Sequence, residues 1–107
     1  MKRFALILIT HFKPAWHTLP EEEQAGFAAR VRRAAQSVNV TPTVGYTLST
    51  PGALLEIWEA DDKSALEQFK QKLDALGYNN FYDQVLMRGE RETQWQRGLD
   101  KAGQTPP

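Results

Sequence analysis

The sequence predicts an α+β domain whose elements run strand, helix, strand, strand, helix, strand. Short apolar runs rich in β-favouring residues predict the strands, two stripes of apolar residues at three- and four-residue steps predict the helices, and a Pro-Gly turn joins the middle strands. The 107 residues are close to the commonest domain size, so one hydrophobic core is expected. We assign residues 1–92 to this domain and residues 93–107 to a polar tail that we expect to be partly disordered.

The first strand is expected to begin with the apolar run at residues 4–9 and to continue through Phe12. Because both alternating sets of side chains in this run are apolar, the strand is expected to be buried on both faces and central in its sheet. It should stop at Lys13-Pro14, since proline donates no hydrogen bond to a strand ladder and restricts the residue before it.

A helix is expected next, because Thr18 and Glu21 have the spacing of a capping box and Pro20 suits a first helical turn. Asn39 and the Thr41-Pro42 pair should end it. Its apolar residues form one stripe that needs a sheet to cover it. They are Phe27, Ala28, Val31, Ala34, Ala35 and Val38.

Two strands and a tight turn form the middle of the chain. Residues 43–49 alternate apolar with polar side chains, and residues 54–60 form a second apolar strand. Pro51-Gly52 lies between them, and so short a connection makes the pair an antiparallel hairpin. Within the second strand of the pair, Glu56 and Glu59 are expected on opposite faces of the sheet.

The second helix should be capped by Asp61 or Asp62 and should end at Gly77, where a left-handed carboxyl cap is expected. Residues 78–83 then form a polar-aromatic connection with room for a short helical turn, and residues 84–91 form the last strand. The apolar stripe of this helix consists of Leu66, Phe69, Leu73 and Leu76.

This order of elements predicts a ferredoxin-like fold, a four-stranded antiparallel sheet with both helices on one face. Two interlocked βαβ units with right-handed crossovers around the hairpin produce this arrangement. The other face of the sheet is then bare, although Ala5, Ile7 and Ile9 make it apolar. Because an exposed apolar patch commonly marks an interface, and a twofold dimer is the commonest way to cover one, we expect a homodimer.

Charge and composition argue against several classes of function. The 13 basic and 13 acidic residues balance, so we expect no nucleic-acid partner and no membrane partner. The one basic cluster, Arg30, Arg32 and Arg33, is interpreted as complementing the carboxyl end of the helix dipole. With two histidines and no cysteine, the chain is not expected to hold a metal or to use a thiol nucleophile. The short apolar start fits neither a signal sequence nor a membrane span, which favours a cytoplasmic location.

Short motifs around the predicted connections carry a family resemblance. Phe12-Lys13-Pro14, followed by residues 18–22, resembles the dimeric α/β-barrel superfamily, and the resemblance covers residues 3–91. Three further matches are similar to darcynin-like bacterial proteins, namely Pro14-Ala15-Trp16, Ile57-Trp58 with Asp61, and Phe81-Tyr82. The resemblance implies sheets packed face to face and a pocket between each helix layer and its sheet. Members include cofactor-free monooxygenases of aromatic polyketides, muconolactone-type isomerases, haem-degrading enzymes and stress-response proteins, so the fold alone assigns no reaction.

The candidate site lies where the first strand stops. His11 is close to the end of that strand, the loop after it carries Trp16 and His17, and the second helix delivers residues 79–83 to the same end. Histidine carries protons near neutral pH, and Asp83 can orient it. We therefore predict His17 or His11 as a catalytic base. The expected ligand-binding residues are Trp16 as a wall, Tyr46 and Asn80 as hydrogen-bond partners, and Trp58 as a floor.

The same residues also have a purely structural interpretation. In that case His11 is a satisfied strand-end histidine, His17 lies in solvent and Trp16 fixes its loop to the core. Tyr46 is either a pocket hydroxyl or an amphipathic residue of the dimer interface. Glu56 is interpreted as a solvated or interfacial acid, although it shares a face with apolar neighbours.

Two classes of function remain open. The preferred hypothesis is a dimer that binds a small aromatic or polyketide-like molecule and acts on it, without a cofactor, as an oxygenase or isomerase. The alternative is a non-enzymatic dimer used for binding or regulation. A haem-degrading enzyme ranks below both, because nothing near the histidines favours iron. A cavity larger than about 300 Å³ between helices and sheet, lined by His11 or His17, would favour an enzyme, whereas a closed core with both histidines outside would exclude it.

Overall fold

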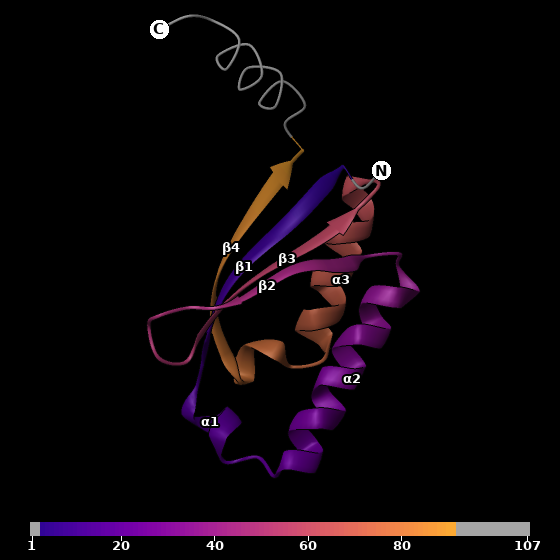
Figure 1. Ribbon diagram of the computed structural model, residues 1–107. Helices are drawn as coiled ribbons and strands as arrows, with labels where there is room; N and C mark the ends of the chain where they lie inside the picture. The colour runs from indigo at the N-terminus through magenta and orange to yellow at the C-terminus, as the bar shows by residue number, and fades with distance from the viewer. Residues whose placement is uncertain (1–2, 92–107) are drawn as a thin grey trace, which may run out of the picture.

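The computed structural model describes residues 3–91 and confirms the predicted ferredoxin-like fold (Figure 1). One antiparallel sheet has the strand order β2-β3-β1-β4, and the two long helices cover one of its faces. The strands are β1 (Phe4–Phe12), β2 (Thr41–Thr47), β3 (Ala53–Ala60) and β4 (Tyr82–Glu90). The helices are α1 (Pro14–His17), α2 (Glu21–Ser37), α3 (Lys63–Ala75) and the 3-10 helix η1 (Tyr78–Asn80). The tail predicted for residues 93–107 lies outside the described residues.

Strand β1 is central, as predicted, and pairs with β3 on one side and β4 on the other. Its side chains alternate between the two faces, so Leu6, Leu8 and Thr10 lie buried under the helices. The core is therefore confined to the space between the sheet and the helix layer. Its other large members come from the helices, from β3 and from the start of β4, and they are Phe27, Trp58, Leu66, Phe69, Leu73, Tyr78 and Tyr82.

Helix α3 begins and ends where the sequence predicts. Asp62 is its N-cap, and the Oδ1 atom accepts a hydrogen bond from the backbone N–H of Ala65 at 2.8 Å. Gly77 follows the helix with a φ of 77°, the left-handed conformation expected of a carboxyl cap. The predicted helical turn after it is η1.

The predicted capping box of α2 is wrong. The Thr18 hydroxyl donates a hydrogen bond to the carbonyl of Ala15 at 2.8 Å, and Pro20 occupies the N-cap with no side-chain cap. The reason is local competition, because residues 14–17 form the unpredicted helix α1 and Thr18 serves as its carboxyl cap.

The interpretation of the arginine cluster is also corrected. Helix α2 continues to Ser37, and its last turn contains no basic residue. Arg30, Arg32 and Arg33 therefore all lie before the last turn. Arg30 lies 5.7 Å from the ring centre of Phe27, whereas Arg32 reaches a cavity described below.

Two strands begin two residues before their predicted starts. Strand β2 covers Thr41–Thr47 rather than residues 43–49, so Pro42 lies inside it. An edge strand tolerates proline because one side of its backbone has no partner, and the ladder is irregular between Pro42 and Val44. Strand β4 begins at Tyr82, two residues before the predicted start.

The sheet face away from the helices is apolar and uncovered. It carries Ala5, Ile7 and Ile9 of β1 beside Leu55 and Ile57 of β3 in the antiparallel register. These residues do not pack against the helix-side core. The four exposed large apolar residues among residues 3–91 all lie on this face, namely Tyr46 (63% exposed), Val85 (55%), Met87 (45%) and Val44 (37%). Within residues 3–91, no helix is long and apolar enough to span a membrane.

Candidate ligand pocket

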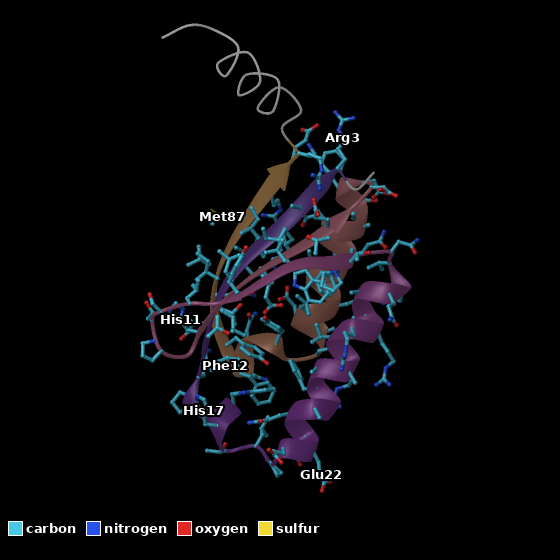
Figure 2. All side chains as sticks on the ribbon, viewed as in Figure 1. Arg3, His11, Phe12, His17, Glu22 and Met87 are labelled. Carbon is cyan, nitrogen blue, oxygen red and sulfur yellow. The ribbon has the colours of Figure 1, made fainter. Side chains whose placement is uncertain are left out.

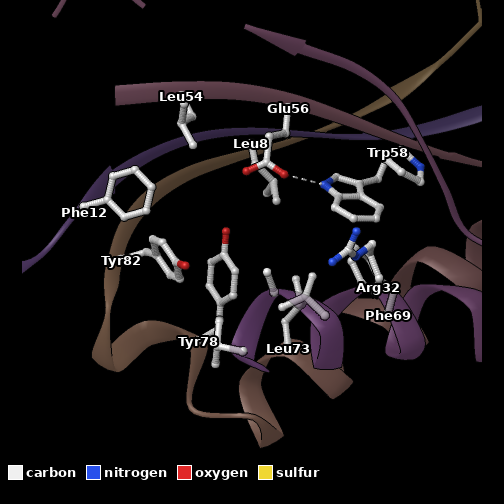
Figure 3. A pocket seen from close by; sticks show the side chains of 14 residues that line it. Leu8, Phe12, Arg32, Leu54, Glu56, Trp58, Phe69, Leu73, Tyr78 and Tyr82 are labelled. Carbon is white, nitrogen blue, oxygen red and sulfur yellow. Dashed lines mark hydrogen bonds between the residues drawn. The ribbon is translucent and has the colours of Figure 1, made fainter. Parts of the chain in front are cut away.

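A cavity of about 410 Å³ lies between the helix layer and the sheet (Figure 3). Most of its surface is apolar and aromatic. Its volume exceeds the threshold of about 300 Å³ that is typical of small-molecule sites. The lining residues are Leu8, Phe12, Phe27, Ala28, Val31, Arg32, Pro42, Leu54, Glu56, Trp58, Phe69, Leu73, Tyr78 and Tyr82.

The packing of the two long helices explains why this space exists. Helix α3 packs directly on β1 and β3, whereas α2 makes its closest backbone approach to α3. Ala28 and Val31 of α2 face the space between that helix and the sheet, and their short side chains leave it unfilled. Ala28, Arg32 and Pro42 are exposed, so the opening to solvent lies between α2 and β2.

Glu56 is the one carboxylic acid in the cavity lining. It pairs with Leu8 in the sheet register and therefore faces the helices, while Glu59 pairs with Ala5 on the bare face. The opposite orientation of the two glutamates confirms the prediction from strand alternation. Figure 3 shows the Glu56 carboxyl directed from β3 into the cavity.

The surroundings of Glu56 change its protonation. Burial raises the pKa of the carboxyl above its ordinary value, because an apolar environment disfavours the charged form. The indole N–H of Trp58 donates a hydrogen bond to Glu56 Oε2 at 3.1 Å and acts in the opposite direction, but burial is the larger effect. The result is an oriented carboxyl group whose proton is held more tightly than in water.

Two tyrosines form the wall opposite β3. The rings of Tyr78 and Tyr82 lie 4.3 Å apart between centres, and both residues are buried. Burial raises the pKa of Tyr78 to about 12, with a smaller contribution from the Glu56 charge and an opposing one from the Thr10 hydroxyl. Burial likewise raises the pKa of Tyr82. Both phenols therefore stay neutral at physiological pH and can donate hydrogen bonds.

Trp58 lines the cavity, and its ring lies 4.8 Å from that of Phe69, while its role as a ligand floor stays a prediction. Trp16 does not line it. Its ring stacks on Phe12 at 5.5 Å and lies 5.3 Å from Tyr82, so it packs against the outside of the aromatic wall. This position matches the structural interpretation of Trp16.

Neither histidine lines the cavity. His11 has the same alternation as Ile9 and lies exposed on the bare face, opposite Asp83 in the register of β1 and β4. His17 is exposed at the end of α1, with its ring 6.0 Å from that of Phe12 (Figure 2). The catalytic role predicted for the two histidines stays a prediction, and the cavity gives it no support.

Tyr46 and Asn80 also lie outside the cavity. Tyr46 is on edge strand β2 and faces the bare side of the sheet, which fits the interface alternative. Asn80 is exposed in η1, where its backbone N–H bonds to the carbonyl of Gly77 at 3.0 Å. The loops themselves are neighbours, as predicted, since Lys13 donates from its backbone N–H to Phe81 at 2.7 Å.

Sequence reasoning missed four polar residues of the cavity. The sequence interprets Arg32 as a complement to the helix dipole and Glu56 as a solvated or interfacial acid. It gives Tyr78 and Tyr82 no role beyond a polar-aromatic connection. The signal for Glu56 was present, because alternation along β3 sets it between Leu54 and Trp58 on one face.

Among residues 3–91, no group of three or more His, Cys, Asp or Glu side chains is arranged to hold a metal ion. The polar groups that converge on the cavity are carboxyl, phenol, indole and guanidinium groups. They suit an organic molecule with an apolar body. The described chain is thus a ferredoxin-like domain with an apolar cavity between its helix layer and its sheet.

Comparison with known proteins supports the fold and assigns no family. No protein-family model and no curated protein matches the sequence. A candidate chlorite dismutase has a similar structure, with a TM-score of 0.67 and 12% identity over 83% of this chain and 43% of that one. The chain thus spans less than half of that protein. A protein of unknown function from Nitrosomonas europaea aligns with a TM-score of 0.51 and 17% identity, over 85% of this chain and 90% of its own.

A candidate antibiotic biosynthesis monooxygenase from Deinococcus radiodurans aligns with a TM-score of 0.44 and 18% identity, over 84% of this chain and 92% of that one. That score is too low to support an argument. At these identities the two better alignments establish a shared ferredoxin-like fold. The resemblance to darcynin-like proteins stays a prediction.

Proposed function

We propose that this protein is a homodimer that binds a small aromatic molecule in the cavity and moves a proton on it through Glu56. One observation carries the proposal, an apolar cavity of about 410 Å³ into which a single carboxyl group is directed. Apolar walls bind flat rings by excluding water, and the few polar groups fix their orientation.

The chemistry follows from the state of the carboxyl. A general base works best when its pKa approaches the operating pH, and burial moves Glu56 in that direction. Glu56 accepts a proton from a carbon or hydroxyl of the ligand that is activated by a carbonyl or ring. Tyr78 and Trp58 supply hydrogen-bond donors near the negative charge that forms.

Two reactions begin with this proton transfer. In an isomerase, Glu56 returns the same proton to another carbon of the ligand, so atoms and charge balance without a further reactant. In a cofactor-independent oxygenase, the ligand anion is oxidised by molecular oxygen, which is a second substrate. The structure supports the shared first step, and we take that step as the proposed activity.

The bare face supports the dimer. Apolar side chains occupy its centre, whereas charged groups border it at both ends. Arg91 pairs with Glu59 at 2.7 Å at one end, and Lys13 approaches Asp83 at 3.6 Å at the other. An apolar centre with a polar rim is the usual composition of a protein interface.

Ligand binding tests the proposal first. Beta-naphthol, a neutral bicyclic phenol, is expected to bind in calorimetry, and Val31→Trp should abolish binding because the larger ring fills the cavity. Gln36→Trp is the matched control, since Gln36 is exposed on the same helix and does not line the cavity. Equal binding by both variants would place the ligand elsewhere.

Proton transfer tests the chemistry. Wild-type protein should accelerate the exchange of the acidic carbon-bound protons of beta-tetralone for deuterium, followed by NMR in deuterium oxide. Glu56→Gln should slow the exchange about 100-fold or more, and Asp61→Asn, with the same change of charge at an exposed position, should not. Binding of beta-naphthol without any exchange would favour the non-enzymatic alternative.

The same assay decides between the cavity and the histidines. If His17→Ala or His11→Ala slows exchange while Glu56→Gln does not, the base lies outside the cavity and the sequence-based prediction is correct.

A further inference from the structure

Only two of the residues that line the cavity carry a charge, and they have opposite signs. Glu56 enters from β3 in the sheet, and Arg32 enters from α2 in the helix layer. No ion pair or hydrogen bond joins them, although opposite charges in one cavity attract each other. Each is therefore available to a separate part of a ligand.

Arg32 lies at the solvent opening. It is exposed, and its guanidinium has no ion pair and no hydrogen bond within residues 3–91. Three other arginines have carboxylate partners within residues 3–91, namely Arg3 with Glu90, Arg88 with Glu67 and Arg91 with Glu59. Arg30 and Arg33 have no such partner there, but neither of them lines the cavity. An unpaired guanidinium at the edge of an apolar cavity is suited to receive an anion.

The guanidinium favours one kind of anion. Its N–H donors lie in a planar fork that matches the two oxygens of a carboxylate. The carboxylate must remain near the opening, because further inside it would meet the carboxyl of Glu56 and lose its water without compensation. A neutral hydroxyl can occupy the inner position and bond to Glu56.

We propose that the cavity selects aromatic hydroxy acids, with the ligand carboxylate bound by Arg32 at the opening and the ligand hydroxyl directed to Glu56. This inference rests on the proposed function and narrows it to a ligand class. The rings occupy the apolar walls between the two groups. Arg32 binds and orients the ligand, and Glu56 remains the group that touches the reacting atoms.

The test compares three bicyclic probes by calorimetry at neutral pH. Beta-naphthol has the hydroxyl alone, beta-naphthoate has the carboxylate alone, and a hydroxynaphthoate with its two groups on opposite rings has both. Wild-type protein should bind the hydroxynaphthoate about tenfold more tightly than beta-naphthol, the difference expected from one charge-assisted contact. High salt should reduce that advantage, since the contact is close to solvent.

Substitutions of two neighbouring arginines show which residue is responsible for the preference for the hydroxynaphthoate. Arg32→Gln should bring the ratio of the two dissociation constants close to one, and Arg32→Lys should retain part of it because a point charge replaces the planar fork. Arg33→Gln is the control, with the same charge change at the neighbouring exposed position outside the cavity. A loss of the preference in Arg33→Gln as well would overturn the inference.

The outcomes separate the inference from the proposal on which it rests. Equal affinity of wild-type protein for beta-naphthol and the hydroxynaphthoate overturns the ligand class and leaves the binding function intact. Absence of binding by all three probes overturns both.

Discussion

Glu56 is the residue on which the proposed chemistry depends, and its position is costly. A carboxylate placed against apolar walls loses most of its hydration, and one hydrogen bond from Trp58 replaces only part of it. A cavity that served packing alone would be filled more cheaply by an apolar side chain. The cost indicates a role for the group.

This cost predicts a pH-dependent stability. The pKa of Glu56 is raised in the folded state, so the contribution of this carboxyl to folding stability is fully present below the ordinary carboxyl pKa. That contribution is lost as the pH rises through the pKa that Glu56 has in the folded protein. Glu56→Gln removes this loss of stability, because the amide does not ionise and has nearly the same shape as the carboxyl group. We expect the variant to match wild-type protein near about pH 4 and to melt at a higher temperature at neutral pH.

Thermal unfolding of both proteins across this pH range measures the difference. Asp61→Asn serves as the control, since it removes an exposed carboxylate near the end of the same strand. A stability difference between wild type and Glu56→Gln that is constant with pH would contradict a raised pKa in the cavity.

The alternation of side chains along the strands is the signal by which the sequence predicts which residues face the site. It correctly placed Glu56 and Glu59 on opposite faces, and it also places His11 with Ile9 on the bare face. The expected histidine site relied instead on which loops share one end of the sheet. The position of a loop at one end of the sheet does not determine where its side chains point. The loops are therefore neighbours, although neither histidine lines the cavity.

At the scale of elements, local signals predicted best. The start and end of α3 depend on Asp62 and Gly77, whose preferences act within a few residues. The prediction for the start of α2 is wrong because Thr18 serves as the carboxyl cap of α1 instead of the N-cap of α2. Trp16 of α1 also packs against Phe27 of α2, a contact that the local sequence pattern does not show.

Gly77 provides a test at this scale. Its φ of 77° is strained for any residue with a Cβ atom, and an added Cβ would lie 2.9 Å from the Asn80 side-chain nitrogen. Gly77→Ala should lower the free energy of unfolding in urea by about 1–2 kcal/mol. Gly45→Ala is the control, because nothing lies within 4 Å of its added Cβ and its φ is not positive.

The control variant should remain within about 0.5 kcal/mol of wild-type protein. Equal losses in the two variants would mean that removal of glycine, rather than the left-handed backbone, is responsible. Because Gly77 leads into η1 and the Tyr78 wall, its replacement should also weaken binding of beta-naphthol.

At the scale of the whole molecule, one sheet has two apolar faces and a single helix layer. The sequence predicted this arrangement from the two alternating apolar sets of β1. A pocket between the helix layer and the sheet was implied only by the resemblance to the dimeric α/β-barrel superfamily. Residue patterns could not predict its lining, because the distance of α2 from the sheet results from the packing of α2 on α3. The bare face therefore follows from the sequence pattern, and the lining of the cavity follows from three-dimensional packing.

The bare face predicts that Met87→Lys converts a dimer into a monomer. Met87 pairs with Ile7 in the centre of that face, so in a dimer the new ammonium group would be buried without a partner. In an isolated monomer the same substitution is nearly neutral, because Met87 is exposed. Light scattering at micromolar concentration should give the dimer mass for wild-type protein and the monomer mass for the variant.

Gln68→Lys is the matched control, since it adds the same charge at an exposed position of α3 in the helix layer and should remain dimeric. Monomeric wild-type protein would refute the dimer directly. The cavity lies on the opposite face of the sheet and is lined by residues of one chain, so monomeric Met87→Lys should still bind beta-naphthol. Loss of both properties together would instead show that dimerisation maintains the separation of α2 from the sheet.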